Sequence, residues 1–131
     1  MTKKKIYKIF LNEKEIGTSK LEKGDAPMGT VLGKLDFTNK DYGYKEIKEY
    51  CEINKIELAI DYPNDKMIST MTLDKLKVIN EIGAEIKGTG NQITGMDNDE
   101  YEISIFGIPY PFYKTEFYNL VKEYENRFKN D

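Results

Sequence analysis

The sequence predicts an α+β fold: a mainly antiparallel sheet of about six or seven strands and two helices, with the C-terminal helix packed on the sheet. Short apolar stretches with alternating polarity recur between Gly, Pro, Asn and Asp clusters, which is typical of strands and turns. Two other stretches show the helical period. The 131 residues contain no internal repeat, linker or low-complexity tract, so we expect a single domain over 1–131.

The N-terminal third predicts a three-stranded meander. Residues 4–11 form an alternating stretch that is apolar on both sides, and the polar residues 12–15 supply a turn. The following stretch, EIGTSKLEKGDAPMGTVLGKLDF, has five glycines and prolines between short apolar pieces. We therefore expect strands over 16–21 and 29–37, separated by a loop over 23–28.

The middle of the chain predicts one helix followed by strands. From Asp41 onward a helical period appears in the positions Tyr44, Ile47, Tyr50, Cys51 and Asn54, with Asn39 or Asp41 as the N-cap. A strand is expected over 56–62, where Pro63 stops it. The pattern KLKVINEIGAEIKG predicts a hairpin with strands 75–80 and 84–87 and a turn at 81–83.

The last third predicts a loop, a strand and a helix. Residues 88–100, GTGNQITGMDNDE, are glycine-rich and acidic, so a surface loop is expected before a strand over 101–108. The two prolines of IPYPFY enforce an extended or turning segment. Thr115 is the expected cap of the final helix. Its apolar stripe is Phe117, Leu120, Val121, Tyr124 and Phe128, opposite Lys114, Lys122, Glu123 and Arg127, and we expect the stripe to pack on the sheet.

The net charge and the cysteine content limit which kinds of partner and which cellular compartment are expected. The net charge is −3 with a pI near 5.2, which argues against nucleic acid as a direct ligand, because phosphate binding needs clustered Lys and Arg. An acidic surface suits a basic protein partner instead. A single cysteine, no signal-peptide pattern and no apolar run long enough to span a bilayer predict a cytoplasmic protein without a membrane partner.

The residue types exclude the commonest catalytic sites. There is no histidine, which removes Ser-His-Asp and Cys-His sites and the commonest zinc ligand. Cys51 lies on the apolar side of the first predicted helix, where burial raises the pKa of a thiol, so we interpret it as structural. We predict no catalytic residue, no metal and no cofactor. A carboxylate-based hydrolase or ligand-binding protein stays open as the alternative, because 23 Asp and Glu can always supply a pair.

The acidic run at 96–102 is the first candidate binding segment. Asp97, Asp99, Glu100 and Glu102 lie within six residues, but the run lacks the glycine and the final glutamate of an EF-hand loop. It predicts either a solvated loop or a contact with a basic partner. The adjacent GTGNQITG at 88–95 lacks the Gly-Lys-Ser/Thr ending of a phosphate-binding loop.

Aromatic residues supply the second candidate. Ten tyrosines and six phenylalanines make up 12% of the chain. Tyr110, Phe112 and Tyr113 stand beside two prolines, and aromatics held in this way lose little entropy on binding. They are predicted partner contacts, with core packing as the other interpretation.

Two stretches, GTSKLEKGDAPMGTVLGKL at 17–35 and GIPYPFYKTEF at 107–117, carry a resemblance to known proteins. They resemble small bacterial proteins of unassigned function with a Leu-Glu…Asp-x-Pro-Met-Gly signature and a Pro-Tyr-Pro ending; the signature residues here are Leu21, Glu22, Asp25, Pro27, Met28 and Gly29. Small acidic bacterial proteins of this type look like the immunity proteins that block a toxin domain. In physical terms the signature is a turn, since Pro27 fixes φ and Gly29 permits positive φ.

These observations predict a non-enzymatic, protein-binding protein, of which an immunity (antitoxin-like) protein that occludes a basic toxin domain is the favoured form. Charge would supply the speed of association and aromatic residues its affinity. The identity of the partner and the oligomeric state stay open.

Overall fold

The computed structural model describes residues 5–129 as an α+β fold with two antiparallel sheets. The four-stranded sheet has the order β5 (Asp36–Phe37), β2 (Lys14–Ser19), β1 (Tyr7–Leu11) and β8 (Leu76–Ile79). The six-stranded sheet has the order β3 (Lys23–Asp25), β4 (Thr30–Lys34), β10 (Tyr101–Phe106), β9 (Gly90–Met96), β7 (Met67–Thr70) and β6 (Leu58–Tyr62). The helices are α1 (Tyr44–Ile53), α2 (Phe112–Glu116) and α3 (Tyr118–Lys129), together with a 3-10 turn, η1 (Ala26–Met28).

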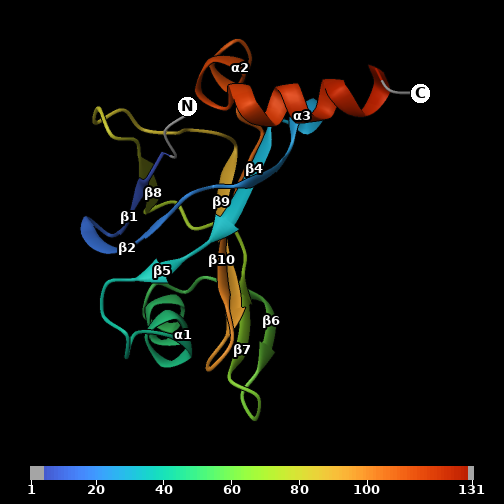
Figure 1. Ribbon diagram of the computed structural model, residues 1–131. Helices are drawn as coiled ribbons and strands as arrows, with labels where there is room; N and C mark the ends of the chain where they lie inside the picture. The colour runs from blue at the N-terminus through green and yellow to red at the C-terminus, as the bar shows by residue number, and fades with distance from the viewer. Residues whose placement is uncertain (1–4, 130–131) are drawn as a thin grey trace.

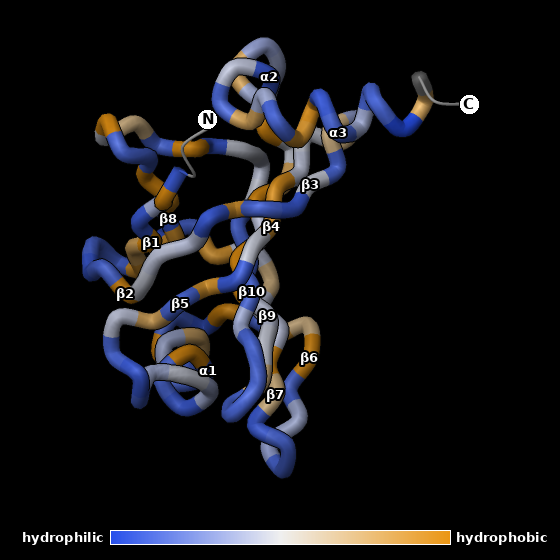
Figure 2. Tube along the Cα trace, in the orientation of Figure 1, coloured by the Kyte–Doolittle hydropathy of each residue, from blue (hydrophilic) through white to orange (hydrophobic). Residues whose placement is uncertain are grey.

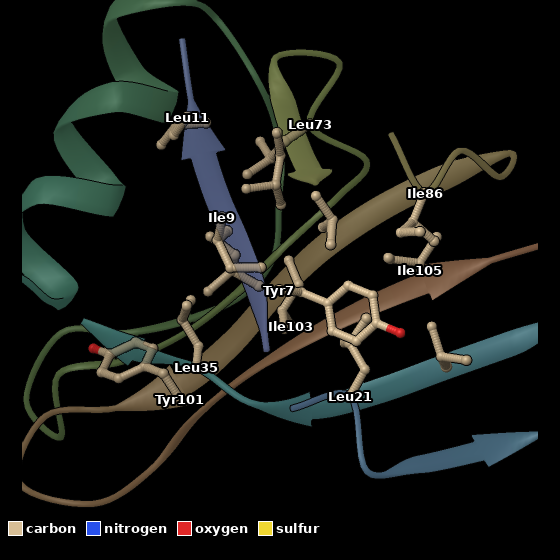
Figure 3. Packing of buried hydrophobic residues seen from close by; sticks show 14 of the residues in the cluster. Tyr7, Ile9, Leu11, Leu21, Leu35, Leu73, Ile86, Tyr101, Ile103 and Ile105 are labelled. Carbon is tan, nitrogen blue, oxygen red and sulfur yellow. The ribbon is translucent and has the colours of Figure 1, made fainter. Parts of the chain in front are cut away.

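The core lies between the two sheets. Alternate residues of each strand point inward, so Tyr7 and Ile9 from β1 belong to the same buried cluster as Ile103 and Ile105 from β10 (Figure 3). Helix α1 covers one end of this core, and α2 and α3 cover the other (Figure 1). All the helices therefore lie on the inner side of the six-stranded sheet or at its ends.

The predicted three-stranded meander is wrong in its third strand. Residues 29–37 divide into β4, which pairs with β3 and β10 in the six-stranded sheet, and β5, which pairs with β2 in the other. The chain crosses between the sheets at Leu35, whose N–H donates to Tyr101 O at 2.8 Å and whose side chain is buried. Burial of Leu35 in the shared core holds this crossing in place.

The predicted loop over 88–100 is also wrong. Its centre is β9, a seven-residue strand between β10 and β7. The inward positions are Asn91 and Ile93, and the Asn91 side chain is accommodated because Nδ2 donates to Leu76 O at 2.6 Å. The next strand of the sheet, β7, was not predicted. Outside β9, the predicted loop keeps residues 88–89 and the turn at 97–100.

The middle hairpin is confirmed in part. β8 matches the predicted strand 75–80, but the predicted strand 84–87 contributes only one bridge, between Ile79 and Glu85. The strand predicted over 56–62 is present as β6.

Helix α1 is confirmed, but its capping differs from the prediction. The Asn39 side chain accepts from Asp41 N at 2.9 Å, ahead of the helix, so neither residue caps it. Instead, Glu46 Oε1 accepts from Gly43 N at 2.8 Å and Asp97 Oδ1 accepts from Tyr44 N at 2.9 Å. A residue distant in the sequence therefore satisfies a free N–H at the start of α1.

The C-terminal helix is two helices, α2 and α3, because Phe117 leaves the helical conformation with φ −115° and ψ 45°. Thr115 lies inside α2 and its hydroxyl donates to Pro111 O at 3.3 Å, so it is not the predicted cap. Phe117 and Val121 of the predicted stripe are buried, whereas Phe128 is 61% exposed. The stripe packs as predicted from Phe117 to Tyr124, and Phe128 is exposed because α3 extends past the sheet (Figure 1).

Candidate functional site

The acidic run forms the turn between β9 and β10, and its residues have different roles. Asp97 is partly buried, and its Oδ1 accepts from Tyr44 N at 2.9 Å and from the Tyr101 hydroxyl at 2.7 Å. Burial of Tyr101 and this hydrogen bond raise the pKa of its phenol. Asp99 and Glu100 are exposed, and Glu102 is half-buried. Asp97 is thus engaged in the fold, whereas Asp99 and Glu100 point to solvent.

The predicted aromatic contacts mainly anchor a turn. Tyr113 is buried and its hydroxyl donates to Thr30 O at 2.9 Å; burial raises the pKa of Tyr113 to about 12. The hydroxyl of Tyr110, which is half exposed, donates to Ala26 O at 2.6 Å, and Phe112 is partly buried. A fully buried Tyr113 cannot contact a partner, so the prediction for that residue is wrong.

The signature turn and the Pro-Tyr-Pro segment, distant in the sequence, meet in space. Pro27 lies in the first turn of η1, Asp25 precedes it without a side-chain cap hydrogen bond, and Gly29 ends it with φ +65°. A Cβ on Gly29 would lie 2.5 Å from Ile108 O, and Ile108 N donates to Gly29 O at 2.9 Å. Met28 is left 68% exposed. Turn geometry explains Pro27 and Gly29, while the exposure of Met28 has no role in the fold.

The acidic run and the aromatic segment do not form one surface. They precede and follow β10, respectively, so the six residues of that strand separate them (Figure 1). At about 3.3 Å per residue the separation is about 20 Å. The predicted partner-binding residues therefore lie at opposite ends of the molecule.

Three chain segments, 40–48, 61–67 and 96–102, meet around the acidic run, and we name them the acidic end. Asp97 joins them, since its side chain accepts from Tyr44 N and its N–H donates to Lys66 O at 3.2 Å. The three segments contain eight carboxylates and four lysines. An excess of four negative charges is thus concentrated at one end of a chain whose total is −3.

Part of this charge is neutralised internally. The Tyr44 hydroxyl donates to Asp61, and Lys48 Nζ lies 3.1 Å from both the Tyr44 oxygen and an Asp61 oxygen. The hydrogen bond from Tyr44, followed by Lys48, lowers the pKa of Asp61. A lowered pKa keeps Asp61 ionised at neutral pH, which suits a structural carboxylate and not a general acid.

The sequence did not reveal a row of apolar side chains beside the acidic end, of which Tyr62 is exposed and Met67 and Met96 are half-buried. Tyr62 pairs with Met67 across β6 and β7, and Met67 pairs with Met96 on β9, so the three side chains share one face. Met96 N donates to Glu100 O at 3.4 Å, which places Glu100 next along the row. Tyr62 is 55% exposed. We name Tyr62, Met67 and Met96 the apolar row. The sequence signal that could have revealed this row is the alternation of these residues with inward-pointing ones.

The apolar row belongs to the outer side of the six-stranded sheet, which we name the open face. Its further side chains, taken from the strand register, are Lys23, Asp25, Thr30, Leu32, Lys34, Ile60, Ser69, Gln92, Thr94, Glu102, Ser104 and Phe106. Every one of them is exposed or half-buried. No described element covers this side in Figure 1, and β6 is coloured hydrophobic at its margin in Figure 2.

A groove of 690 Å³ opens on the other side, between α3 and the chain crossings at 20–22 and 34–36. Its carboxylates are Glu22, Asp36, Glu116 and Glu123, the kind of set that a carboxylate hydrolase requires. Glu116, however, accepts hydrogen bonds from the Tyr7 hydroxyl at 2.8 Å and from Asn80 Nδ2 at 3.1 Å, and it pairs with Lys5 at 3.3 Å. Glu116 therefore links α2 to the four-stranded sheet.

Comparison of the chain with protein-family models, curated proteins and solved structures finds no match. Among the described residues, no three Cys, Asp or Glu side chains converge as a metal site would require. Within the same range, none of the helices combines the length and apolar character of a bilayer span.

Proposed function

We propose that this chain is a protein-binding protein, and specifically an immunity (antitoxin-like) protein that occludes a basic toxin domain. The observation that carries the proposal is the apolar row of Tyr62, Met67 and Met96 beside the exposed carboxylates of Asp99 and Glu100. Exposed aromatic and methionine side chains are enriched at interfaces, where they supply affinity. Neighbouring carboxylates accelerate the encounter with a positively charged partner.

The proposed binding surface differs from the one predicted from the sequence in its aromatic residues. Tyr110 and Tyr113 hydrogen-bond to the backbone at the signature turn and just after it, Phe112 packs against the core, and Tyr62, Met67 and Met96 take their place next to the acidic run. The combination of charge and apolar contact is retained with different residues. Folding gives no reason for exposing this row, because the core forms on the inner side of the same strands.

Co-expression with the product of the adjacent gene tests the proposal, because an immunity protein acts on a toxin encoded beside it. We expect the two proteins to purify as a complex, and the toxicity of that product to disappear when this chain is present. Absence of both the complex and the protection would refute the proposal.

A further inference from the structure

We propose that the open face of the six-stranded sheet is the docking surface, and that the partner covers it with lysine or arginine side chains arranged around an apolar centre. The exposed carboxylates of Asp99 and Glu100, with Glu102 on the same face, then lie over the partner's cations, and the apolar row packs on its centre. This inference rests on the proposed function and names the surface and the chemistry of the partner.

The open face has the size of a specific interface. It consists of six strands, the longest of seven residues. With strands about 4.8 Å apart and about 3.3 Å per residue, strands that average five residues give a face of about 29 by 16.5 Å, or about 480 Å² before side-chain relief is added. Stable complexes bury about 800 Å² per partner, so an interface of that size needs the face together with its charged margin.

The β6 edge of this sheet is protected, so the face and not this edge is available for a partner. β6 is the terminal strand, and a register shift between Leu58 and Ile60 disrupts its regular ladder. Asp61 points inward to Tyr44, and Pro63 follows the strand. A bulge, an inward charge and a proline are the features that prevent strand addition. The exposed side chains of Ile60 and Tyr62 therefore serve a contact across the face.

Charge selects a basic protein over a second copy of this chain. The lysines on the opposite margin, Lys23 and Lys34, have Asp25 and Asp36 nearby, and Lys34 lies 3.7 Å from Asp36. These carboxylates offset part of the lysine charge, and two copies that each carry a net charge of −3 repel one another. A partner with clustered lysine or arginine has the complementary potential.

The test uses the purified product of the adjacent gene and four variants of this chain. Tyr62→Ser and Met96→Ser remove apolar contacts from the face, and Ile82→Ser is the matched control, since Ile82 is 89% exposed in a turn near the other sheet. We expect each face variant to raise Kd at least about 10-fold, as hot-spot residues do, and the control to leave Kd unchanged. Neutralising Asp99 and Glu100 together (D99N/E100Q) should reduce the dependence of the association rate on salt.

The outcomes separate this inference from the proposed function. A complex that forms with wild-type affinity in both face variants overturns the docking surface and leaves the function standing. No complex with the wild-type chain refutes the proposed function and, with it, this inference. If the wild-type chain alone sediments as a dimer and the face variants are monomers, the occupant is a second copy and the basic partner is wrong.

Discussion

Replacing Asp97 with alanine should destabilise the fold, although this residue lies in an acidic turn that the sequence marks as a binding loop. The substitution removes the acceptor for Tyr44 N at the start of α1, and losing such a cap costs about 1 kcal/mol. It also leaves the nearly buried Tyr101 hydroxyl without its acceptor, which costs about 1–3 kcal/mol. The expected total is about 2–4 kcal/mol.

Urea unfolding, followed by circular dichroism or tyrosine fluorescence, measures this loss. With a slope of about 2 kcal/mol/M, the midpoint should fall by about 1–2 M. Asp97→Asn keeps an Oδ1 acceptor and should lose less than half as much. The matched control is Asp99→Ala, an exposed carboxylate of the same turn, which should change stability by less than about 0.5 kcal/mol. Equal stability of the Asp97→Ala and Asp99→Ala variants would refute the structural role of Asp97.

Three further predictions concern the glycine turn and two hydrogen-bonded clusters. Gly29→Ala should cost more than about 2 kcal/mol in thermal or urea unfolding, because positive φ costs about 1–2 kcal/mol and the added Cβ meets a carbonyl oxygen. Gly83→Ala, also at positive φ but with no atom within 4 Å, should cost only about 1 kcal/mol; equal losses would contradict the steric argument. The pKa of Asp61 is lowered, so its stabilising effect is present above about pH 4 and disappears as the pH falls through the folded-state pKa. On acidification between about pH 5 and 3, the Asp61→Asn variant should therefore lose less stability than the wild type. Parallel curves of unfolding free energy against pH would argue against this role of Asp61. Burial and Glu116 raise the pKa of Tyr7, so the stability that Tyr7 contributes is present below about pH 10 and declines above it. Tyr7→Phe should cost about 1–2 kcal/mol at pH 7 and should flatten the alkaline decline of the unfolding free energy. An unchanged decline in the variant would disprove this prediction.

The fold class could be predicted because the sequence pattern of a strand is clear, whether one side of the strand packs on the core or both sides do. β1, β8 and β10 place Ile, Leu and Val at inward positions, and these strands lie where the sequence indicated. β9 was missed because a buried asparagine and a glycine occupy inward positions where a hydrophobic residue is expected. A side-chain hydrogen bond to a distant carbonyl makes Asn91 compatible with the core, and no local pattern encodes that partner.

The acidic residues of the candidate site could be predicted from the sequence, but its apolar residues could not. The acidic run could be read directly, but the separation between it and Tyr110 depends on β10 running from one end of the molecule to the other. The apolar row depends on the register of three strands, and Met67 lies on one that the sequence did not reveal. Asp97 could not be distinguished from Asp99, because only the docking of α1 gives it a structural role.

The pairing of β4 with β10 has a consequence for synthesis on the ribosome. β4 ends at Lys34, and its neighbour begins only at Tyr101. At about 5–20 residues per second, the nascent chain waits roughly 3–13 s for that neighbour to be made. Throughout this interval Val31 and Leu32 stand in an unfinished sheet with one free ladder of amides and carbonyls. During translation this hairpin therefore exposes a strand edge that a holding chaperone can protect.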